Sequence, residues 1–176
     1  CRMVELPYAS HSAKIIINQR SWQANFRLDE SYLCTMDQGK PLVSRFSGHK
    51  DAVYALAEGR EGYFYSAGAD GWVVEWQLNN PEQGRLLARM PGAVYALLFL
   101  PLQNLLLVAV KDDGFHGLDV IEGKEIFALP ASGKSWFRMQ LLSDGSILAA
   151  GSDGNLARFF PQSGQIQFLK FGQSNL

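Results

Sequence analysis

The segment Ala52-Val53-Tyr54-Ala55-Leu56 recurs without change at residues 93–97, 41 residues further along the chain. A further step of 41 residues leads to Trp136, an aromatic residue in the place of the repeated tyrosine. Three Asp-Gly pairs keep nearly the same spacing, at Asp70-Gly71, Asp113-Gly114 and Asp153-Gly154. Self-similarity at a period of about 20–50 residues is typical of repeat architectures. The sequence therefore predicts a chain built from units of roughly 41 residues.

Each unit predicts four short strands and no helix. Runs of apolar or small residues precede the Asp-Gly pairs at residues 63–68, 105–110 and 146–151, and further β-type runs follow them. An Asp-Gly pair between such runs is a strong hairpin signal. No segment sustains the spacing of an amphipathic helix. We therefore expect an all-β fold, a β-propeller of four-stranded antiparallel blades, because one small sheet cannot bury both of its faces alone.

About four units fit into the chain, as a single domain over residues 1–176. The blades are expected near residues 11–47, 48–90, 91–130 and 131–171. In the first blade, residues 14–18 and 42–46 are expected as the first and fourth strands, and residues 2–6 remain as a spare outer strand. Because a ring must close its sheet edges, we expect either a homodimer that completes a ring of about eight blades or a segment of a longer chain.

Composition excludes several classes of protein. The chain has 176 residues, 47% of them hydrophobic, which suits a globular core. A formal net charge of -1 gives no basic footprint, so we expect no nucleic-acid partner. The longest apolar run, residues 93–102, is shorter than the ~18–20 residues of a membrane-spanning helix, so no membrane span is expected. Cys1 and Cys34 match no metal-ligand spacing and no targeting segment is readable, so we expect neither metal nor cofactor, and a cytoplasmic location.

Residues 48–90 resemble one repeat of the WD-repeat family. Gly48-His49 stands where that family has its Gly-His pair, and Ser66, Asp70 and Trp76 stand at its serine, aspartate and tryptophan positions. The resemblance implies a propeller blade in which hydrogen bonds run from Trp76 through Ser66 and His49 to Asp70. It also implies a non-catalytic scaffold that binds a protein or peptide partner. The role implied for the four side chains is structural, since a buried indole N–H and an imidazole both need partners.

The other units depart from this pattern. At the positions of Ser66 and Trp76, the third unit has Ala109 and Asp119, and the fourth has Ala149 and Phe159. The resemblance therefore extends over the whole chain in its period and turns, but in its motif only over the second unit. Other propeller families with Asp-Gly hairpins stay open.

His49, Asp70 and Ser66 also have the side chains of a general base, its orienting carboxylate and a nucleophile. Because all three occupy positions that hold a WD-type blade together, we expect a structural role and no catalytic residues. His11 and His116 lack acidic or sulfur partners at metal-ligand spacing. The alternative function is a propeller enzyme, a hydrolase or a quinone-cofactor oxidoreductase, with its site at the central channel. It would require convergent ionisable residues at the entries of the first strands.

The repeated aromatic residues have a simpler interpretation than a binding site. Tyr54, Tyr95 and Trp136 stand at equivalent positions of the first strands, where packing between blades is expected. Asp112 and Asp113 adjoin, but a turn residue beside a solvated loop charge explains them without acid-base chemistry.

A partner-binding face is expected where the connections of the units gather. His49 and Asp70 can meet only if the connections before the first strand and after the second strand emerge on one face. The candidate residues in or beside these connections are Lys50, Asp51, Trp72, Lys111, Asp112, Phe115, Lys134 and Ser135. Trp72 and Phe115 each follow an Asp-Gly turn, and an aromatic residue ringed by charge is typical of an interface anchor. Packing of Trp72 against its own hairpin explains that residue equally well.

Overall fold

The computed structural model describes residues 13–17 and 44–170, and within these ranges the fold is all-β, as expected. Three four-stranded antiparallel sheets account for most of the described chain, and a two-stranded sheet precedes them. The helices of the described residues are two short 3-10 turns, η3 (Pro101–Gln103) and η4 (Ser152–Gly154). No helix in these ranges is long and apolar enough to cross a membrane.

The three four-stranded sheets follow one another along the chain, and each lies within one of the expected repeats. The first contains β3 (Val53–Glu58), β4 (Tyr63–Gly68), β5 (Trp72–Gln77) and β6 (Asn80–Arg89). The second contains β7 (Val94–Leu100), β8 (Leu105–Val110), β9 (Gly114–Asp119) and β10 (Lys124–Pro130). The third contains β11 (Trp136–Leu141), β12 (Ile147–Gly151), β13 (Asn155–Phe159) and β14 (Ile166–Lys170). In every sheet the strands pair in chain order.

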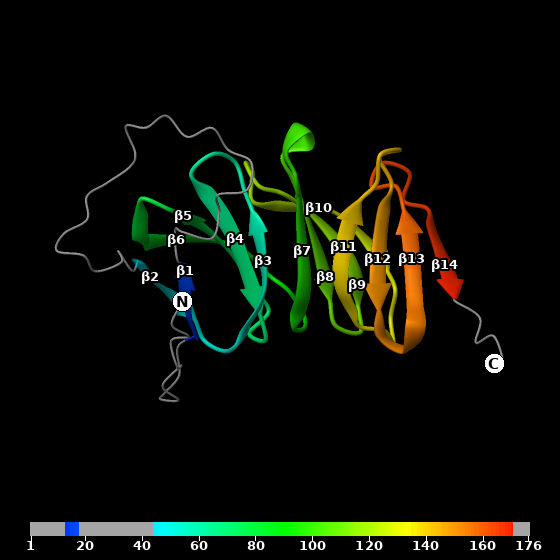
Figure 1. The fold of residues 1–176 in the computed structure, drawn as a ribbon, viewed down its shortest axis with the longest axis horizontal. Coiled ribbons are helices and arrows are strands. Elements are labelled where there is room, and N and C mark those ends of the chain that lie inside the picture. The colour runs from blue at the N-terminus through cyan, green and yellow to red at the C-terminus, as the bar shows by residue number, and fades with distance from the viewer. Residues whose placement is uncertain (1–12, 18–43, 171–176) are drawn as a thin grey trace, which may run out of the picture.

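The first strands of the three sheets form the middle of the molecule. Figure 1 shows β3, β7 and β11 side by side, with the remaining strands of each sheet extending away from this row. The sheets therefore turn their faces toward one another. This arrangement is consistent with a blade-type fold.

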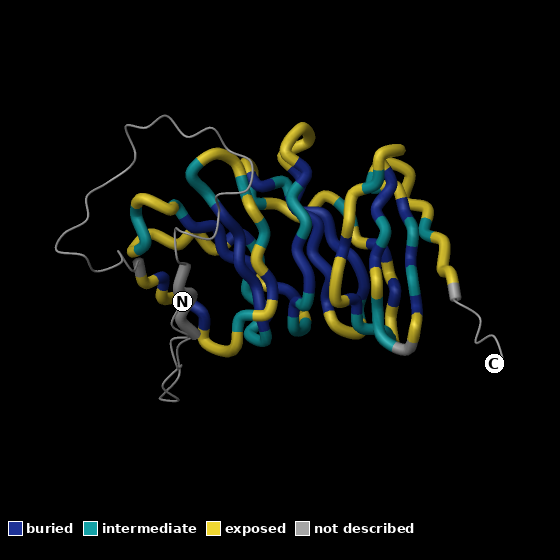
Figure 2. The backbone as a smooth tube through the Cα atoms, in the orientation of Figure 1, coloured by how far each residue is buried: buried dark blue, intermediate teal, exposed yellow. Residues whose placement is uncertain are grey.

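Apolar side chains fill the spaces between neighbouring sheets. One cluster, which includes Tyr65, Val73, Leu106 and Val108, lies between the first and second sheets. Another cluster, which includes Leu107, Phe115, Trp136 and Phe159, lies between the second and third sheets. Every residue of β8 is buried, because the second sheet has a neighbour on each face (Figure 2). Burial of this apolar surface is the main force that holds the sheets together.

The Asp-Gly turns close the hairpins between the second and third strands. Gly71 and Gly154 have φ angles of 70° and 69°, in the left-handed region that favours glycine. At Gly71, a Cβ atom would lie 2.7 Å from the carbonyl oxygen of Met90. The tight turn and the close approach of the backbone both require glycine there.

The first repeat differs from the expectation. β1 (Ala13–Ile17) pairs directly with β2 (Ser44–His49) in an antiparallel two-stranded sheet. The sequence places these segments as the first and fourth strands of one blade, at opposite edges of a four-stranded sheet, and direct pairing contradicts that order. The other two expected strands of this repeat and the spare strand at residues 2–6 lie outside the described residues, as do Cys1, His11 and Cys34.

Candidate functional site

A buried polar network joins β2 to the first four-stranded sheet, and it contains the four residues of the WD-type pattern. His49 Nε2 lies 2.7 Å from Ser66 Oγ, and the Nε1–H of Trp76 donates to the same oxygen at 2.7 Å. His49 Nδ1 lies 3.0 Å from a carboxylate oxygen of Asp70. The structure thus brings the four side chains together in the order that the resemblance implies.

The direction of donation through this network follows from the ionised state of Asp70. Burial alone would raise the pKa of Asp70, but the backbone N–H groups of Lys50 and Trp72 and the His49 ring together hold that pKa below its ordinary value. The two N–H groups donate to the carboxylate at 2.8 and 3.0 Å. The carboxylate also accepts the Nδ1–H of His49, which leaves Nε2 to accept the hydroxyl proton of Ser66. Each polar side-chain group of the network therefore has a partner.

Ser66, His49 and Asp70 also have the hydrogen-bond order of a hydrolytic triad. Ser66 is completely buried, and its Oγ already accepts the indole N–H of Trp76. A nucleophile has to reach the carbon that it attacks, and this hydroxyl has no open side from which a substrate could approach. The three residues are placed to link strands, not to attack a substrate.

The second and third sheets arrange their polar side chains differently, which sequence reasoning missed. The buried His116 of β9 lies between two carboxylates, 3.0 Å from Asp113 and 3.2 Å from Glu125. The third sheet has another cluster, formed by Asp144, Ser146 and Arg158. Among the described residues, no group of three or more His, Cys, Asp or Glu side chains is arranged to hold a metal ion.

The connections that were expected on one face gather at one end of the sheets, the lower end in Figure 1. The backbone N–H of Asp112 donates to the carbonyl of Lys134 at 3.2 Å, and the N–H of Ser152 donates to the carbonyl of Ser135 at 2.8 Å. We call this end the loop face. Of its candidate residues, Lys50, Asp51, Lys111 and Asp112 are exposed, and Trp72, Lys134 and Ser135 are partly buried.

Trp72 is engaged within its own surroundings. Its ring packs against the apolar cluster around Phe46 and Trp76. Two cations cover it: Lys50 Nζ lies 4.8 Å and the Arg89 guanidinium carbon 5.3 Å from the ring centroid. The contacts of Trp72 therefore match packing on its own hairpin.

Phe115 does not belong to the loop face. Its side chain is completely buried between the second and third sheets. Its ring centroid lies 5.1 Å from that of Trp136 and 4.7 Å from that of Phe159. The expectation of an exposed anchor is wrong, because Phe115 lies in β9 with its side chain directed to the neighbouring sheet.

Three other aromatic side chains form a row across the first strands of the sheets. The pairing of β3 with β4 skips Tyr54, that of β7 with β8 skips Tyr95, and that of β11 with β12 skips Phe137. Each is the extra residue of a β-bulge, which directs a side chain away from regular alternation. Neighbouring ring centroids lie 5.4 Å apart in both steps. We call these three residues the aromatic row.

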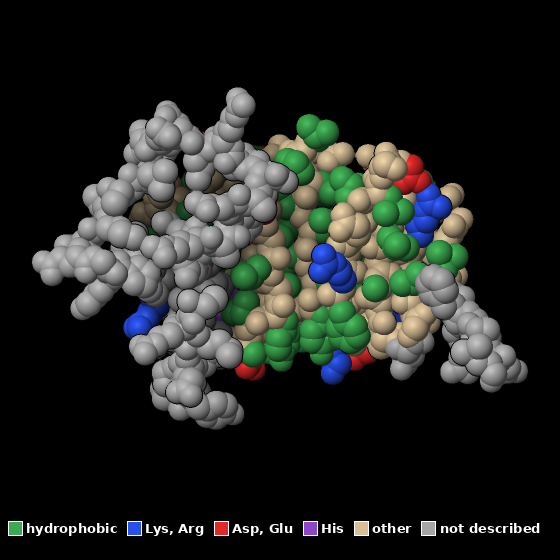
Figure 3. Space-filling model, viewed as in Figure 1, with side chains coloured by type: hydrophobic (Ala, Val, Ile, Leu, Met, Phe, Trp, Pro, Cys, Tyr) green, Lys and Arg blue, Asp and Glu red, His purple; other side chains and the backbone are tan. Residues whose placement is uncertain are grey.

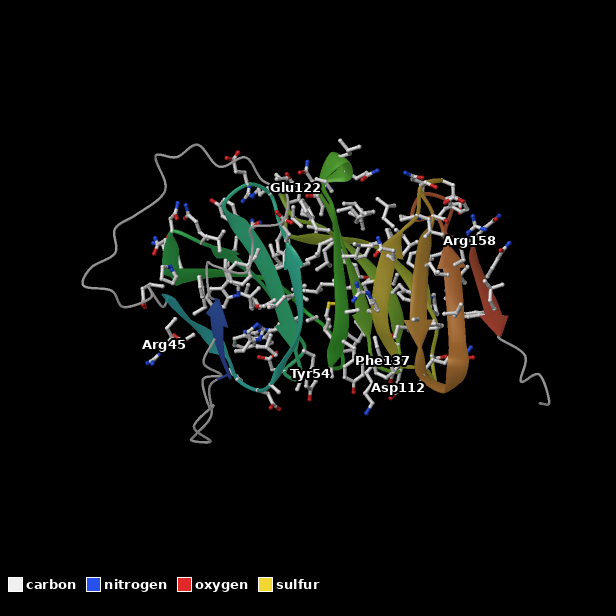
Figure 4. All side chains as sticks on the ribbon, in the orientation of Figure 1. Arg45, Tyr54, Asp112, Glu122, Phe137 and Arg158 are labelled. Carbon is white, nitrogen blue, oxygen red and sulfur yellow. The ribbon has the colours of Figure 1, made fainter. Side chains whose placement is uncertain are left out.

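The aromatic row lies at the surface. Tyr54 is 52% and Phe137 54% exposed, and Tyr95 between them is partly buried. The row lines a hollow of about 470 Å³ between β3, β7 and β11. Figure 4 places Tyr54 and Phe137 near the loop face, and Figure 3 shows hydrophobic side chains gathered at this end.

The period of 41 residues predicts a different membership and role for the row. A step of that length matches Trp136 to Tyr54 and Tyr95, but Trp136 takes the paired position that Val94 holds in β7. Trp136 is completely buried, and Phe137 is the third member of the row. The expected core packing of the two tyrosines is therefore wrong. The sequence signal was present, since an aromatic residue directly follows Trp136.

Comparison with known proteins shows partial relationships. No protein-family model matches the chain. The chain is 28% identical to TBC1 domain family member 31 of Xenopus tropicalis over 132 residues, 72% of the chain and 12% of that protein. It is 29% identical to the protein of the same name from Oryzias latipes, over 73% of the chain and 12% of that protein. For the Pongo abelii protein of that name, the identity is 28%, over 69% of the chain and 14% of that protein. The chain thus spans 12–14% of the length of these curated relatives.

Proposed function

We propose that the chain is a segment of a WD-repeat-type propeller that acts as a non-catalytic interaction module for a protein or peptide. The observation that carries this proposal is the aromatic row, in which three bulges hold Tyr54, Tyr95 and Phe137 in mutual contact at the surface. The first and last rings are more than half exposed. Exposed aromatic side chains that a scaffold holds in place are typical anchors of protein interfaces.

The surroundings of the row support the same function. Leu56, which follows Tyr54 and Ala55 in β3, is 54% exposed and lines the same hollow. Charged residues of the loop face, among them Lys50, Asp51 and Asp112, lie at the edge of this apolar surface. An apolar centre with a polar rim is the usual anatomy of an interface.

A pair of surface variants tests the proposal. Tyr54→Ser and Phe137→Ser remove apolar area from the row, and Ile126→Ser removes it from β10, where the side chain is 58% exposed outside the hollow. The tagged chain and its variants are used to capture proteins from a cell extract, and captured proteins are then tested by direct binding with the purified chain. We expect binding that survives Ile126→Ser and is lost in the row variants. Partners that bind all variants equally would contradict the proposal.

We further propose that two copies associate into a ring of about eight blades. The support is the outer surface of the third sheet, where Phe168 and Leu169 are 48% and 44% exposed. Light scattering of the purified chain should then give twice 19.5 kDa. A stable species of 19.5 kDa at micromolar concentration would contradict this assembly without affecting the aromatic row.

A further inference from the structure

The residue after the bulge distinguishes the first strand of the third sheet from those of the other two. In β3 and β7 this position holds Ala55 and Ala96, which are 6% and 5% exposed. In β11 the same position holds Arg138, which is exposed. Arg138 directly follows Phe137 and lines the same hollow as the aromatic row. A guanidinium group thus lies beside the apolar surface.

Arg138 has no ion-pair partner among the residues that the structure describes, unlike several other arginines. Arg60 and Arg85 pair with Glu75, and Arg158 pairs with Asp144. Arg138 also makes no side-chain hydrogen bond with a described residue. Its five N–H donors can therefore be used by a bound group, and a carboxylate matches their planar geometry with two parallel bonds.

Charge at the loop end of the row decides between an anionic and a cationic ligand. Aromatic faces attract cations, so a lysine or arginine of a partner is the competing occupant. Two of the exposed lysines adjoin an aspartate, as Lys50-Asp51 and Lys111-Asp112. Lys134 and Arg138 have no such adjacent acid and leave an excess of positive charge at the Phe137 end. Glu58, the acidic residue of the hollow, ends β3 away from the bulge. This distribution repels a cation from Phe137 and attracts a carboxylate.

We propose that the site binds an acidic peptide segment, in which an apolar or aromatic side chain is followed or preceded directly by Asp or Glu. The apolar side chain packs on Tyr95 and Phe137, and the carboxylate pairs with Arg138. This inference rests on the proposed interaction function and names the chemistry of its partner. Tyrosine, phenylalanine and arginine together have the composition of an interface hot spot.

A selection experiment with random peptides tests this chemistry directly. A library of random 12-residue peptides displayed on phage is selected on the purified chain, and binding of individual synthetic peptides is measured by fluorescence anisotropy. We expect selected sequences to pair an apolar residue with Asp or Glu. Replacing that acid by Asn or Gln, or the protein residue by Arg138→Gln, should each weaken binding about tenfold. Arg45→Gln, an exposed arginine of β2, is the matched control and should leave affinity unchanged.

The outcomes separate the two proposals. Peptides that lose binding with Phe137→Ser but bind Arg138→Gln as tightly as the wild type would overturn the acidic motif and keep the interaction site. Selected peptides rich in Lys or Arg would overturn it in favour of a cationic ligand. Retained peptides that bind Phe137→Ser normally, or a selection that retains none, would overturn both proposals. A double-mutant cycle between the peptide acid and Arg138 should show that their effects are not additive.

Discussion

Ser66→Ala is the sharpest test of the buried network, because one hydroxyl has two buried partners. Ser66 Oγ accepts the N–H of Trp76 and lies 2.7 Å from His49 Nε2. These three residues are 0%, 2% and 1% exposed, so water cannot take the place of the lost hydroxyl. The substitution removes a single oxygen atom and leaves a donor and an acceptor without partners.

The expected cost follows from these two unpaired groups. A buried polar group without a partner costs about 1–3 kcal/mol, and part of that cost is offset because alanine no longer buries a hydroxyl. We therefore expect Ser66→Ala to lower the free energy of unfolding by about 2–4 kcal/mol. That is a large part of the ~5–15 kcal/mol that stabilises a typical domain.

Urea unfolding of the full chain, followed by far-ultraviolet circular dichroism, measures this loss. Ser163→Ala is the matched control, because its hydroxyl bonds an exposed carbonyl at 3.3 Å, and it should change stability by less than about 0.5 kcal/mol. In a Trp76→Phe background the indole donor is absent, so Ser66→Ala should cost about 1 kcal/mol less than in the wild type. If Ser66→Ala has no larger effect than Ser163→Ala, the network does not stabilise the fold as argued.

Three further substitutions test other parts of the structure by the same unfolding assay. The folded-state pKa of Asp70 lies below its ordinary value of 3.8, so its stabilising contribution is complete above that pH and is lost as the pH falls through the lowered pKa; stability should therefore decline less steeply in acid for Asp70→Asn than for the wild type. Arg85 donates to the buried Glu75 at 3.0 Å and to carbonyl groups of the second sheet, so Arg85→Ala should cost about 1–3 kcal/mol, with half-exposure of Arg85 limiting the loss, and equal stability of the two proteins would refute this link. Phe115→Ala should cost about 3–5 kcal/mol because it opens a cavity between two sheets, and a cost no greater than that of Trp72→Ala would contradict its burial.

Much of the fold could be predicted from the sequence because turns and alternation act locally. The Asp-Gly pairs placed the hairpins, and residues 105–110 and 155–159 match β8 and β13 at both ends. The pairing of β1 with β2 was not predictable in this way, because it joins segments on either side of residues 18–43. Strand pairing over such a separation depends on tertiary packing that no local pattern encodes.

The candidate site was harder to predict than the fold. The four residues around His49 could be found because their spacing matches a known pattern. The aromatic row was missed because a bulge adds one residue to a strand, and a fixed period of 41 then matched Trp136 instead of Phe137. One residue of shift exchanges the two faces of a strand, so a buried tryptophan was equated with surface tyrosines. Burial of Phe115 likewise depends on the third sheet, which its own hairpin does not reveal.

The contrast between the buried networks and the aromatic row is itself an argument for function. Each sheet satisfies its buried polar groups with a different set of residues, centred on Ser66, His116 and Ser146. Stability of a sheet therefore does not depend on one particular solution. The bulge, in contrast, occurs at the same point of all three first strands and holds an aromatic side chain every time. Since Tyr54 and Phe137 are more than half exposed, the core gains little from them, and a surface that contacts another molecule is the role that accounts for their alignment.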